Sequence, residues 1–312
     1  MINRELIRIK AVQLTYAYFQ NGNNNIENAE KELLFSLSKA YHLYNHLLQL
    51  IVALTKLSRK HMEVSVARAQ RENCPMPSGK FVNNRFAIQL ENNNMLCKFT
   101  EEQKRVWDDN IEYVNKLLGQ IEESELYLDY MNSGMDTYEE DREFWRRVYR
   151  QFVQDNPDID AVLEEISLYW NDDREVVDTF VLKTIKRFDE DSTEEQELLP
   201  EYKDEEDREF ARKLFRSSVL NMEQYQRYMS EASVNWDFSR LAYMDVIIMQ
   251  LAIAEMLGFP NIPVNVTINE YVELAKLYST PRSGGYINGM LDTIARHLID
   301  TGKMHKTMPQ RK

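Results

Sequence analysis

Apolar residues recur every three or four positions through most of the chain, the spacing that places them on one side of an α-helix. The first such stripe predicts a helix over residues 3–20 and consists of Ile7, Ala11, Leu14 and Tyr18. A second stripe predicts a helix over residues 26–58, which contains neither Gly nor Pro. It consists of Leu33, Leu37, Ala40, Leu43 and Leu47. The first part of the chain is therefore expected to be helical.

The helical pattern is interrupted between residues 59 and 100. Two turn-forming clusters, at residues 74–79 and 92–94, indicate a connecting loop with one short helix over residues 85–90. Helical spacing then resumes over residues 101–131. This central part is expected to be one loop followed by one helix.

Three helices are predicted near the C-terminus. Residues 238–257 are apolar almost throughout and are followed by Gly258. Thr267 and Glu270 have the spacing of a capping box, which predicts that the next helix begins at Thr267. The last predicted helix opens at residues 283–285.

An internal repeat relates two segments that lie 66 residues apart. Asp-Arg-Glu-Phe at residues 141–144 recurs at residues 207–210. At the same offset Arg146 matches Arg212, Arg150 matches Arg216, Val153 matches Val219, Trp170 matches Trp236 and Arg174 matches Arg240. The repeat predicts a duplicated pair of helices, with convergent helical patterning as the alternative. The acidic residues 189–207 between the copies are interpreted as a solvated linker.

Composition extends the helical prediction to the whole chain and bears on its location. Gly and Pro supply only 17 of 312 residues, under half of the usual share of about 12%. Two cysteines, Cys74 and Cys97, cannot define a disulfide framework and favour a reducing compartment. No apolar run approaches the ~20 residues of a membrane span, and Arg4, Glu5 and Arg8 stand where a signal peptide would be apolar. A cytoplasmic protein without a membrane segment is expected.

The net charge limits the nucleic-acid partners that the chain can bind. It carries 51 acidic and 38 basic residues, a formal charge of −13. An acidic protein repels polyphosphate at long range, so strong nonspecific binding is not expected. Any RNA contact must be local or shared with a partner.

Known catalytic and cofactor motifs are not found. No glycine-rich phosphate loop or dinucleotide fingerprint is present. His42 and His46 have helical metal-ligand spacing, but without a third ligand they are interpreted as ordinary helix residues. Adjacent carboxylates such as those at 139–140 and 164–165 diverge on a helix and do not form acid–base pairs. No enzyme activity, metal or cofactor is expected, and binding is the leading class of function.

The first predicted helix combines basic and aromatic residues. Arg4 and Arg8 lie one turn apart, Lys10 lies on the other flank of the apolar stripe, and Tyr16 follows. Basic groups contact phosphates and aromatic rings stack on unpaired bases, a combination found in readers of single-stranded RNA. An ordinary helix with a buried aromatic residue is the alternative.

Residues 4–16 resemble the opening helix of the NusB transcription antitermination proteins, in which a basic segment precedes Ala-Val-Gln and a tyrosine. Here these residues are 11–13 and Tyr16. The order and approximate spacing of further segments is also similar to that family: residues 245–255, Pro263, residues 268–276 and residues 286–292. The resemblance covers residues 205–300 well and 3–20 moderately, which leaves residues 59–200 as an insertion. Gln250 stands where the family has an arginine, so a surface cation is expected to be missing.

The resemblance implies an all-α fold of two packed helical bundles, NusB-like, with an additional helical insertion that holds the duplicated helix pair. Four segments are expected. They are an N-terminal helical subdomain with the RNA-contacting helix and a loop insertion (1–135), an inserted helical segment with the first repeat copy and the acidic linker (136–200), a C-terminal NusB-like bundle (201–305) and a basic tail (306–312).

The resemblance also implies a function. It implies a non-enzymatic antitermination factor that binds the boxA element of nascent ribosomal RNA together with the small-subunit ribosomal protein NusE, and reaches the RNA polymerase elongation complex indirectly. The implied RNA contacts are Arg4, Arg8, Lys10, Gln13, Tyr16, Asp245, Lys276, Arg282 and Tyr286. The basic residues of the first helix would meet phosphates, the tyrosines would stack on bases, and Asp245 would accept from a base amino group. A protein-binding scaffold without RNA, or an accessory module of an RNA-modifying enzyme, are the alternatives.

Overall fold

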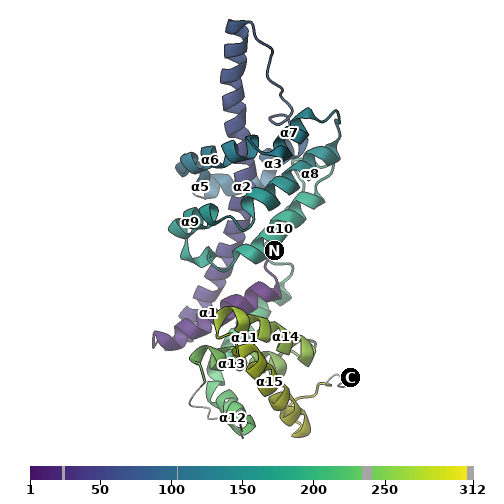
Figure 1. The fold of residues 1–312 in the computed structure, drawn as a ribbon. Helices are drawn as coiled ribbons and strands as arrows, with labels where there is room; N and C mark the ends of the chain where they lie inside the picture. Colours follow the sequence, from purple (N-terminus) through teal and green to yellow (C-terminus); the bar gives the residue numbers. More distant parts are fainter. Residues whose placement is uncertain (23–24, 104, 234–240, 308–312) are drawn as a thin grey trace. The chain divides into compact units, whose positions relative to one another are not determined.

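The computed structural model describes residues 1–22, 25–103, 105–233 and 241–307 (Figure 1). Regular structure in these ranges is helical apart from a single bridge between Ile2 and Tyr202, so the predicted all-α fold is confirmed. No helix in the described ranges combines the length and apolar character that crossing a membrane requires. The repeat partners Trp236 and Arg240, and the tail residues from 308 onward, lie outside these ranges.

The chain forms two compact units, and one of them interrupts the other in sequence. The inserted unit contains Met1 and Ser38–Glu201, whereas the split unit contains Ile2–Leu37 and Tyr202–Lys312. The segments expected from the sequence are consecutive, whereas the split unit joins the two ends of the chain. The insertion therefore begins within α2 (Ile26–Glu72), about 20 residues before the point where the helical pattern breaks.

Helix α13 is the buried centre of the split unit. It is apolar apart from Asp245, Gln250 and Glu255, and every residue from Asp245 to Met256 is buried, as expected for a helix with neighbours all round. The helices of this unit, besides the start of α2, are α1 (Arg4–Gln20), α11 (Glu205–Leu220), α12 (Met222–Ala232), α13 (Tyr243–Gly258), α14 (Val264–Tyr278) and α15 (Ser283–Asp300). Asn3 begins α1, because its side chain accepts a hydrogen bond from the Leu6 amide.

The predicted capping box at the start of α14 is wrong. The helix begins at Val264, directly after Pro263, so Thr267 already lies inside it. The Thr267 hydroxyl is buried and donates to Glu255 at 2.8 Å, while Glu270 accepts from Arg8 at 2.9 Å. Both side chains are used in tertiary contacts, which sequence spacing alone cannot reveal.

The inserted unit is more finely divided than its sequence predicts. Helix α2 continues to Glu72 instead of ending at residue 58, and the helix expected over 101–131 is three helices. The asparagine cluster is a helix start as well as a turn, because the Asn93 side chain caps α4. The helices are α3 (Arg85–Glu91), α4 (Asn94–Glu102), α5 (Val106–Asp109), α6 (Ile111–Glu122), α7 (Glu125–Asn132), α8 (Tyr138–Val148), α9 (Pro157–Ile166) and α10 (Arg174–Arg187).

Buried aromatic side chains join α2 to the later helices of the inserted unit. The indole nitrogen of Trp107 donates to the carbonyl of His46 at 2.6 Å, and that of Trp170 donates to the carbonyl of Lys39 at 2.8 Å. Trp145 is fully buried and its ring packs beside Phe81. These large rings supply much of the apolar area that this unit buries.

The two copies of Asp-Arg-Glu-Phe make the same kind of contact in the two units. Asp141 accepts from Nε of Arg85, the first residue of α3, and Asp207 accepts from Nε of Arg4, the first residue of α1. Each arginine follows an asparagine that caps its helix, Asn84 or Asn3. The phenylalanines of both copies, Phe144 and Phe210, are buried. Each copy of the repeat is therefore paired with an Asn-Arg dipeptide at the start of another helix, Asn3-Arg4 or Asn84-Arg85.

Two buried groups give the inserted unit opposite responses to pH. Burial lowers the pKa of His46 to about 4. As the pH drops, the imidazole takes up a proton in the unfolded chain before it does so in the folded unit. The free energy of unfolding therefore falls between about pH 6.5 and about pH 4. Burial raises the pKa of Asp178 to about 6, against the opposing effect of Arg174. Its folded form takes up the proton first, so stability rises as the pH drops through about 6.

Because these two pH windows overlap, each group should mask the other in the wild-type chain. Relative to wild type, His46→Gln is expected to gain about 2 kcal/mol of unfolding free energy between pH 6 and pH 4.5, and Asp178→Asn is expected to lose a similar amount. Urea denaturation followed by tryptophan fluorescence at several pH values measures both. Curves that run parallel to wild type for both variants would contradict the assignment.

Candidate nucleic-acid interface

The nine residues predicted to contact RNA all lie in the split unit, but they gather near opposite ends of α1. This helix runs antiparallel to α13, because Arg8 pairs with Glu255 near the end of α13 whereas Tyr16 contacts Tyr243 at its start. Arg4 and Tyr16 are separated by about 18 Å of helix. The structure therefore divides the predicted site into two regions.

At the first end, Arg8 lies in the protein interior. Only 4% of its surface is exposed. Its Nε and Nη2 donate to the two carboxylate oxygens of Glu255 at 2.8 and 2.9 Å, and its Nη1 donates to Glu270 at 2.9 Å. Although burial opposes the charge, the hydrogen-bonded Glu255 carboxylate raises the pKa of Arg8. Arg8 thus ties α1 to α13 and α14, and the expected phosphate contact is not available to it.

The other two cations at this end differ in exposure. Lys10 is 1% exposed and also lies in the interior, away from any phosphate. Arg4 is partly exposed and donates to Glu206 at 2.8 Å and to Asp207 at 3.4 Å. Carboxylates of α11 thus neutralise the one cation of this group that reaches solvent.

At the second end, four helices bring the remaining predicted residues together. We call this region the Tyr16 corner, and it consists of Gln13, Tyr16, Tyr243, Asp245, Lys276, Arg282 and Tyr286. Tyr16 and Tyr243 meet edge to face with ring centroids 5.7 Å apart. Gln13 donates to the hydroxyl of Tyr278 at 3.1 Å. The end of α1, the start of α13, the end of α14 and the start of α15 therefore share this corner.

Asp245 organises the corner from within. It is 5% exposed, and its two oxygens accept from the hydroxyls of Ser279, at 2.5 Å, and Ser283, at 3.0 Å. A carboxylate beside the first turn of α15 also suits the positive end of the helix dipole. The expected contact to a base amino group is therefore replaced by contacts that hold the connection between α14 and α15. Burial and this carboxylate together raise the pKa of Tyr286.

The exposed groups of the corner are cations and aromatic rings. Arg282 is exposed, Tyr286 is partly exposed, and Lys276 forms an exposed ion pair with Glu273 at 2.6 Å. The stem of Lys276 passes Gly284, where an added Cβ would lie 3.5 Å from its Cγ. Aromatic rings beside exposed cations can stack on bases and contact phosphates.

Sequence reasoning missed Tyr243, which is 42% exposed and lies against Tyr16. Its position at the start of a strongly apolar helix does not distinguish it from a core residue. The expected loss of a surface cation at Gln250 is also corrected. Gln250 is fully buried, and its amide donates to the carbonyl of Ser218 at 2.8 Å.

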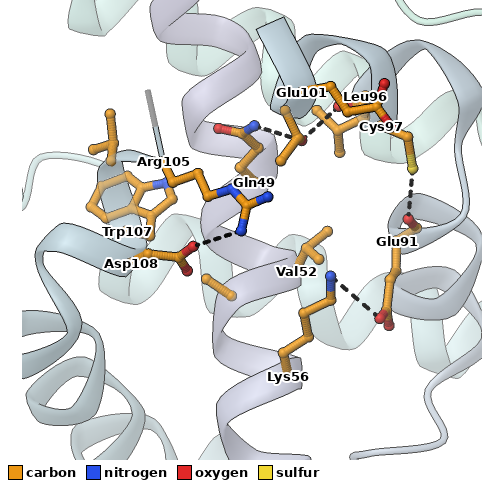
Figure 2. Close-up of a pocket in the computed structure, with 13 residues that line it drawn as sticks. Gln49, Val52, Lys56, Glu91, Leu96, Cys97, Glu101, Arg105, Trp107 and Asp108 are labelled. Atoms are coloured by element: carbon orange, nitrogen blue, oxygen red, sulfur yellow. Dashed lines mark hydrogen bonds and ion pairs between the residues drawn. The ribbon is translucent and has the colours of Figure 1, made fainter. Parts of the chain in front are cut away.

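The inserted unit contains a cavity of about 290 Å³ between α2 and α4 to α5 (Figure 2). Its charged side chains pair with one another: Lys56 lies 3.6 Å from Glu91, and Arg105 lies 3.8 Å from Asp108. Within the described ranges, no group of three or more His, Cys, Asp or Glu residues is arranged to hold a metal ion. Glu101 is the remaining charged side chain of the lining, and a single exposed carboxylate does not by itself define a ligand site.

Comparison with known proteins places the split unit in a family. The sequence model of the NusB family matches residues 176–296, which include most of α10, all of α11 to α14 and α15 as far as residue 296. The transcription antitermination protein NusB of Salinibacter ruber is 38% identical over 109 residues, which are 35% of this chain and 68% of that protein. The NusB protein of Natranaerobius thermophilus is 47% identical over 25% of this chain and 56% of its own length. That of Chloroherpeton thalassium is 35% identical over 32% of this chain and 47% of its own length.

These alignments span from about half to two thirds of the relatives. No solved structure matches the chain significantly. The length and identity of the alignment to the Salinibacter ruber protein are nevertheless sufficient to show the family. The segment matched by the family model contains Tyr243, Asp245, Lys276, Arg282 and Tyr286 of the Tyr16 corner, whereas α1, which carries Gln13 and Tyr16, lies outside it. The chain belongs to the NusB family.

Proposed function

We propose that this chain acts in transcription antitermination by binding single-stranded boxA RNA at the Tyr16 corner, together with the ribosomal protein NusE. The relatives that it matches carry the name of transcription antitermination proteins. The observation that carries the proposal is one corner of the split unit, where Tyr16 of α1 contacts Tyr243 and where the family-matched segment supplies Arg282 and Tyr286. These are positions at which the family resemblance implies RNA contacts.

The chemistry of the corner fits an unpaired strand. Tyrosine rings at Tyr16, Tyr243 and Tyr286 offer flat apolar faces to bases, and stacking of one base on an aromatic ring is worth about 1–3 kcal/mol. Arg282 and Lys276 supply positive charge for neighbouring phosphates. Such a surface recognises splayed bases and does not require the wide groove of a duplex.

A basic partner compensates for the charge of the chain. With a formal charge of −13, the protein alone attracts RNA weakly. A ribosomal protein that binds both this chain and the RNA raises the local concentration of the strand and neutralises part of the repulsion. The complex thus formed on nascent RNA would contact the elongating RNA polymerase indirectly, and no enzyme chemistry is required of this chain.

Tyr286→Ala is expected to weaken binding of boxA RNA by about tenfold, because it removes a stacking surface. Arg282→Ala is expected to weaken it by several-fold and to lower the salt dependence by about one phosphate contact. Fluorescence anisotropy with the full chain, with and without NusE, over a salt series measures both. Arg296→Ala is the matched control, because Arg296 is an exposed cation of α15 that pairs with Asp292.

The outcomes separate the alternatives. If boxA RNA binds no better than a scrambled strand, the proposal fails. If NusE binds and no RNA is recruited, the chain is a protein-binding scaffold. An effect of Arg296→Ala as large as that of Arg282→Ala would show that only net charge matters.

A further inference from the structure

Helix α2 extends beyond the other helices of the inserted unit as an arm (Figure 1). The arm comprises residues 60–73, and residues 74–79 return beside it. Within residues 60–78 only Ala69 is buried. The return segment holds the arm through the Cys74 amide, which donates to the carbonyl of Ala69 at 2.9 Å, and through Gly79, which lies beside Met62. About 20 Å of helix beyond Arg59 is thus presented to solvent.

One face of the arm is basic. Lys60, Val64, Arg68 and Arg71 follow one another at spacings of four, four and three residues, which aligns them on one side of the helix. Val64 is 71% exposed, and the Arg68 side chain is 75% exposed. Met62, Val66 and Ala69 lie on the opposite side and are the less exposed positions. The return segment covers that side, so the basic face is left to solvent.

The charges of this face are little compensated. Among the residues that the structure describes, Lys60 and Arg71 have no carboxylate within ion-pair distance. Arg68 pairs only with Glu72, one turn away and exposed, an interaction worth little. Cations at the base of the arm are held by other helices, since Lys56 and Arg59 both pair with Glu91. The chain as a whole has a formal charge of −13, so a projecting helix with available cations differs in charge from the rest of the protein.

We propose that this basic face contacts the phosphate backbone of RNA without reading its sequence. The inference rests on the proposed function, because it takes single-stranded RNA as the ligand of this chain. Side chains along one helix face can follow successive phosphates of an extended strand. The face has no aromatic ring for stacking, and its apolar side chains are Val64 and the small Ala67, whereas protein interfaces depend on buried aromatic or Arg anchors in pockets. Its chemistry therefore favours a polyanion over a folded protein partner.

The first experiment compares two triple variants of the full chain. The arm variant carries Lys60→Ala, Arg68→Ala and Arg71→Ala. The control variant removes three exposed cations of α10 in the same unit, through Lys183→Ala, Lys186→Ala and Arg187→Ala. The probes are boxA RNA, boxA RNA extended at either end, and an unrelated single strand of the extended length.

The arm variant is expected to bind extended RNA and the unrelated strand at least about tenfold more weakly at low salt, and to lower the salt slope by about 2, because each phosphate contact contributes about 0.7. The short boxA RNA is expected to bind unchanged, since the site proposed for it in the split unit contains none of the three arm cations. Alanine favours helix, so the arm itself should remain folded. Circular dichroism checks this.

The exposed cysteines provide a second measurement that does not depend on charge. Cys74 lies at the tip of the arm, whereas Cys97 lies in α4. A photo-crosslinker attached to Cys74 in a Cys97→Ser chain is expected to label extended RNA. The same group attached to Cys97 in a Cys74→Ser chain is expected to label it far less.

Each outcome judges the arm separately from the proposed function. Equal weakening in both triple variants, or equal labelling from both cysteines, would overturn the role of the arm. If the chain binds RNA without preference for boxA, and the arm variant loses this binding, the proposed role of the arm stands and the boxA assignment fails. If the wild-type chain binds no RNA at low salt, both proposals fail. The RNA assignment would also be overturned if the wild-type chain bound an acidic protein but no RNA, and if the arm variant lost this binding.

Discussion

Replacement of Glu255 by alanine is expected to lower the free energy of unfolding of the split unit by about 3–5 kcal/mol. Glu255 is fully buried and accepts hydrogen bonds from Arg8, Thr267 and Tyr271. Its removal leaves the guanidinium of Arg8 inside the protein with only Glu270, which is partly exposed. A buried charge that loses its partner costs far more than the net value of the original pair.

Hydrogen exchange followed by mass spectrometry reports this loss for each unit separately. Protection is expected to fall in peptides of α1, α13 and α14, and to remain unchanged in the inserted unit. Glu273→Ala is the matched control, because its ion pair with Lys276 is exposed and its removal should cost less than about 1 kcal/mol. A loss in Glu255→Ala no larger than in Glu273→Ala would contradict the structural role of the pair.

This result also determines how RNA-binding data on Arg8 are interpreted. A variant of Arg8 is expected to weaken RNA binding through disruption of α1, α13 and α14. The salt slope per folded molecule would then stay unchanged, because a buried guanidinium has no phosphate counterions to release. Arg282 behaves differently, since it is exposed and its loss should change the slope without changing stability.

Helical periodicity and turn signals were sufficient to predict the fold class and the starts of α1, α2, α3 and α15. The stripe of Ile7 and Ala11 correctly predicted α1, and the apolar residues 238–257 predicted a helix where α13 begins at Tyr243. Helix ends were predicted less well: α2 continues past residue 58 because its next turns, around Met62 and Ala69, are covered by the returning chain. The local hydrophobic pattern does not show that a later segment of the chain will pack on these turns.

The candidate site shows the same limit. Sequence spacing placed Arg4 and Arg8 on one helix face but could not show that acidic side chains from α11, α13 and α14 would meet them. Tyr16 and Tyr286, by contrast, occupy a common corner of the structure. Arg4 and Arg8 are thus unavailable to RNA because of tertiary partners that lie more than 200 residues away along the chain.

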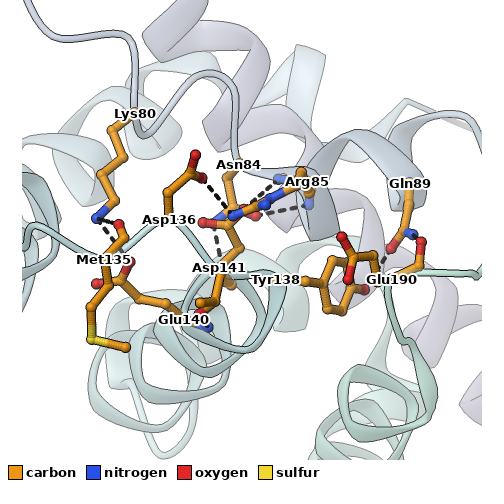
Figure 3. Close-up of polar contacts among 12 residues, drawn as sticks. Lys80, Asn84, Arg85, Gln89, Met135, Asp136, Tyr138, Glu140, Asp141 and Glu190 are labelled. Atoms are coloured by element: carbon orange, nitrogen blue, oxygen red, sulfur yellow. Dashed lines mark hydrogen bonds and ion pairs between the residues drawn. The ribbon is translucent and has the colours of Figure 1, made fainter.

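The second large effect concerns the inserted unit, where Asp141→Ala is expected to cost about 3 kcal/mol of unfolding free energy. Asp141 is 4% exposed and accepts from Nε of Arg85 at 2.6 Å and from the Arg85 amide at 3.1 Å (Figure 3). It also accepts from the hydroxyl of Tyr130 at 2.7 Å. Alanine leaves three donors without their acceptor. Urea denaturation followed by fluorescence of the buried Trp145 measures the loss.

The repeat supplies the matched control, Asp207→Ala in the split unit. Asp207 makes the corresponding contact to Arg4, but at 3.4 Å and with 13% of its side chain exposed, so its removal should cost less than about 1 kcal/mol by hydrogen exchange. In that unit the buried ion pair lies one turn further along the first helix, at Arg8 and Glu255. The corresponding turn of α3 carries Gln89, whose amide donates to the carbonyls of Asp189 and Ser192. Equal losses in Asp141→Ala and Asp207→Ala would mean that the two copies still share one stabilising contact, whereas the expected difference means that each unit has placed its buried charge at a different turn.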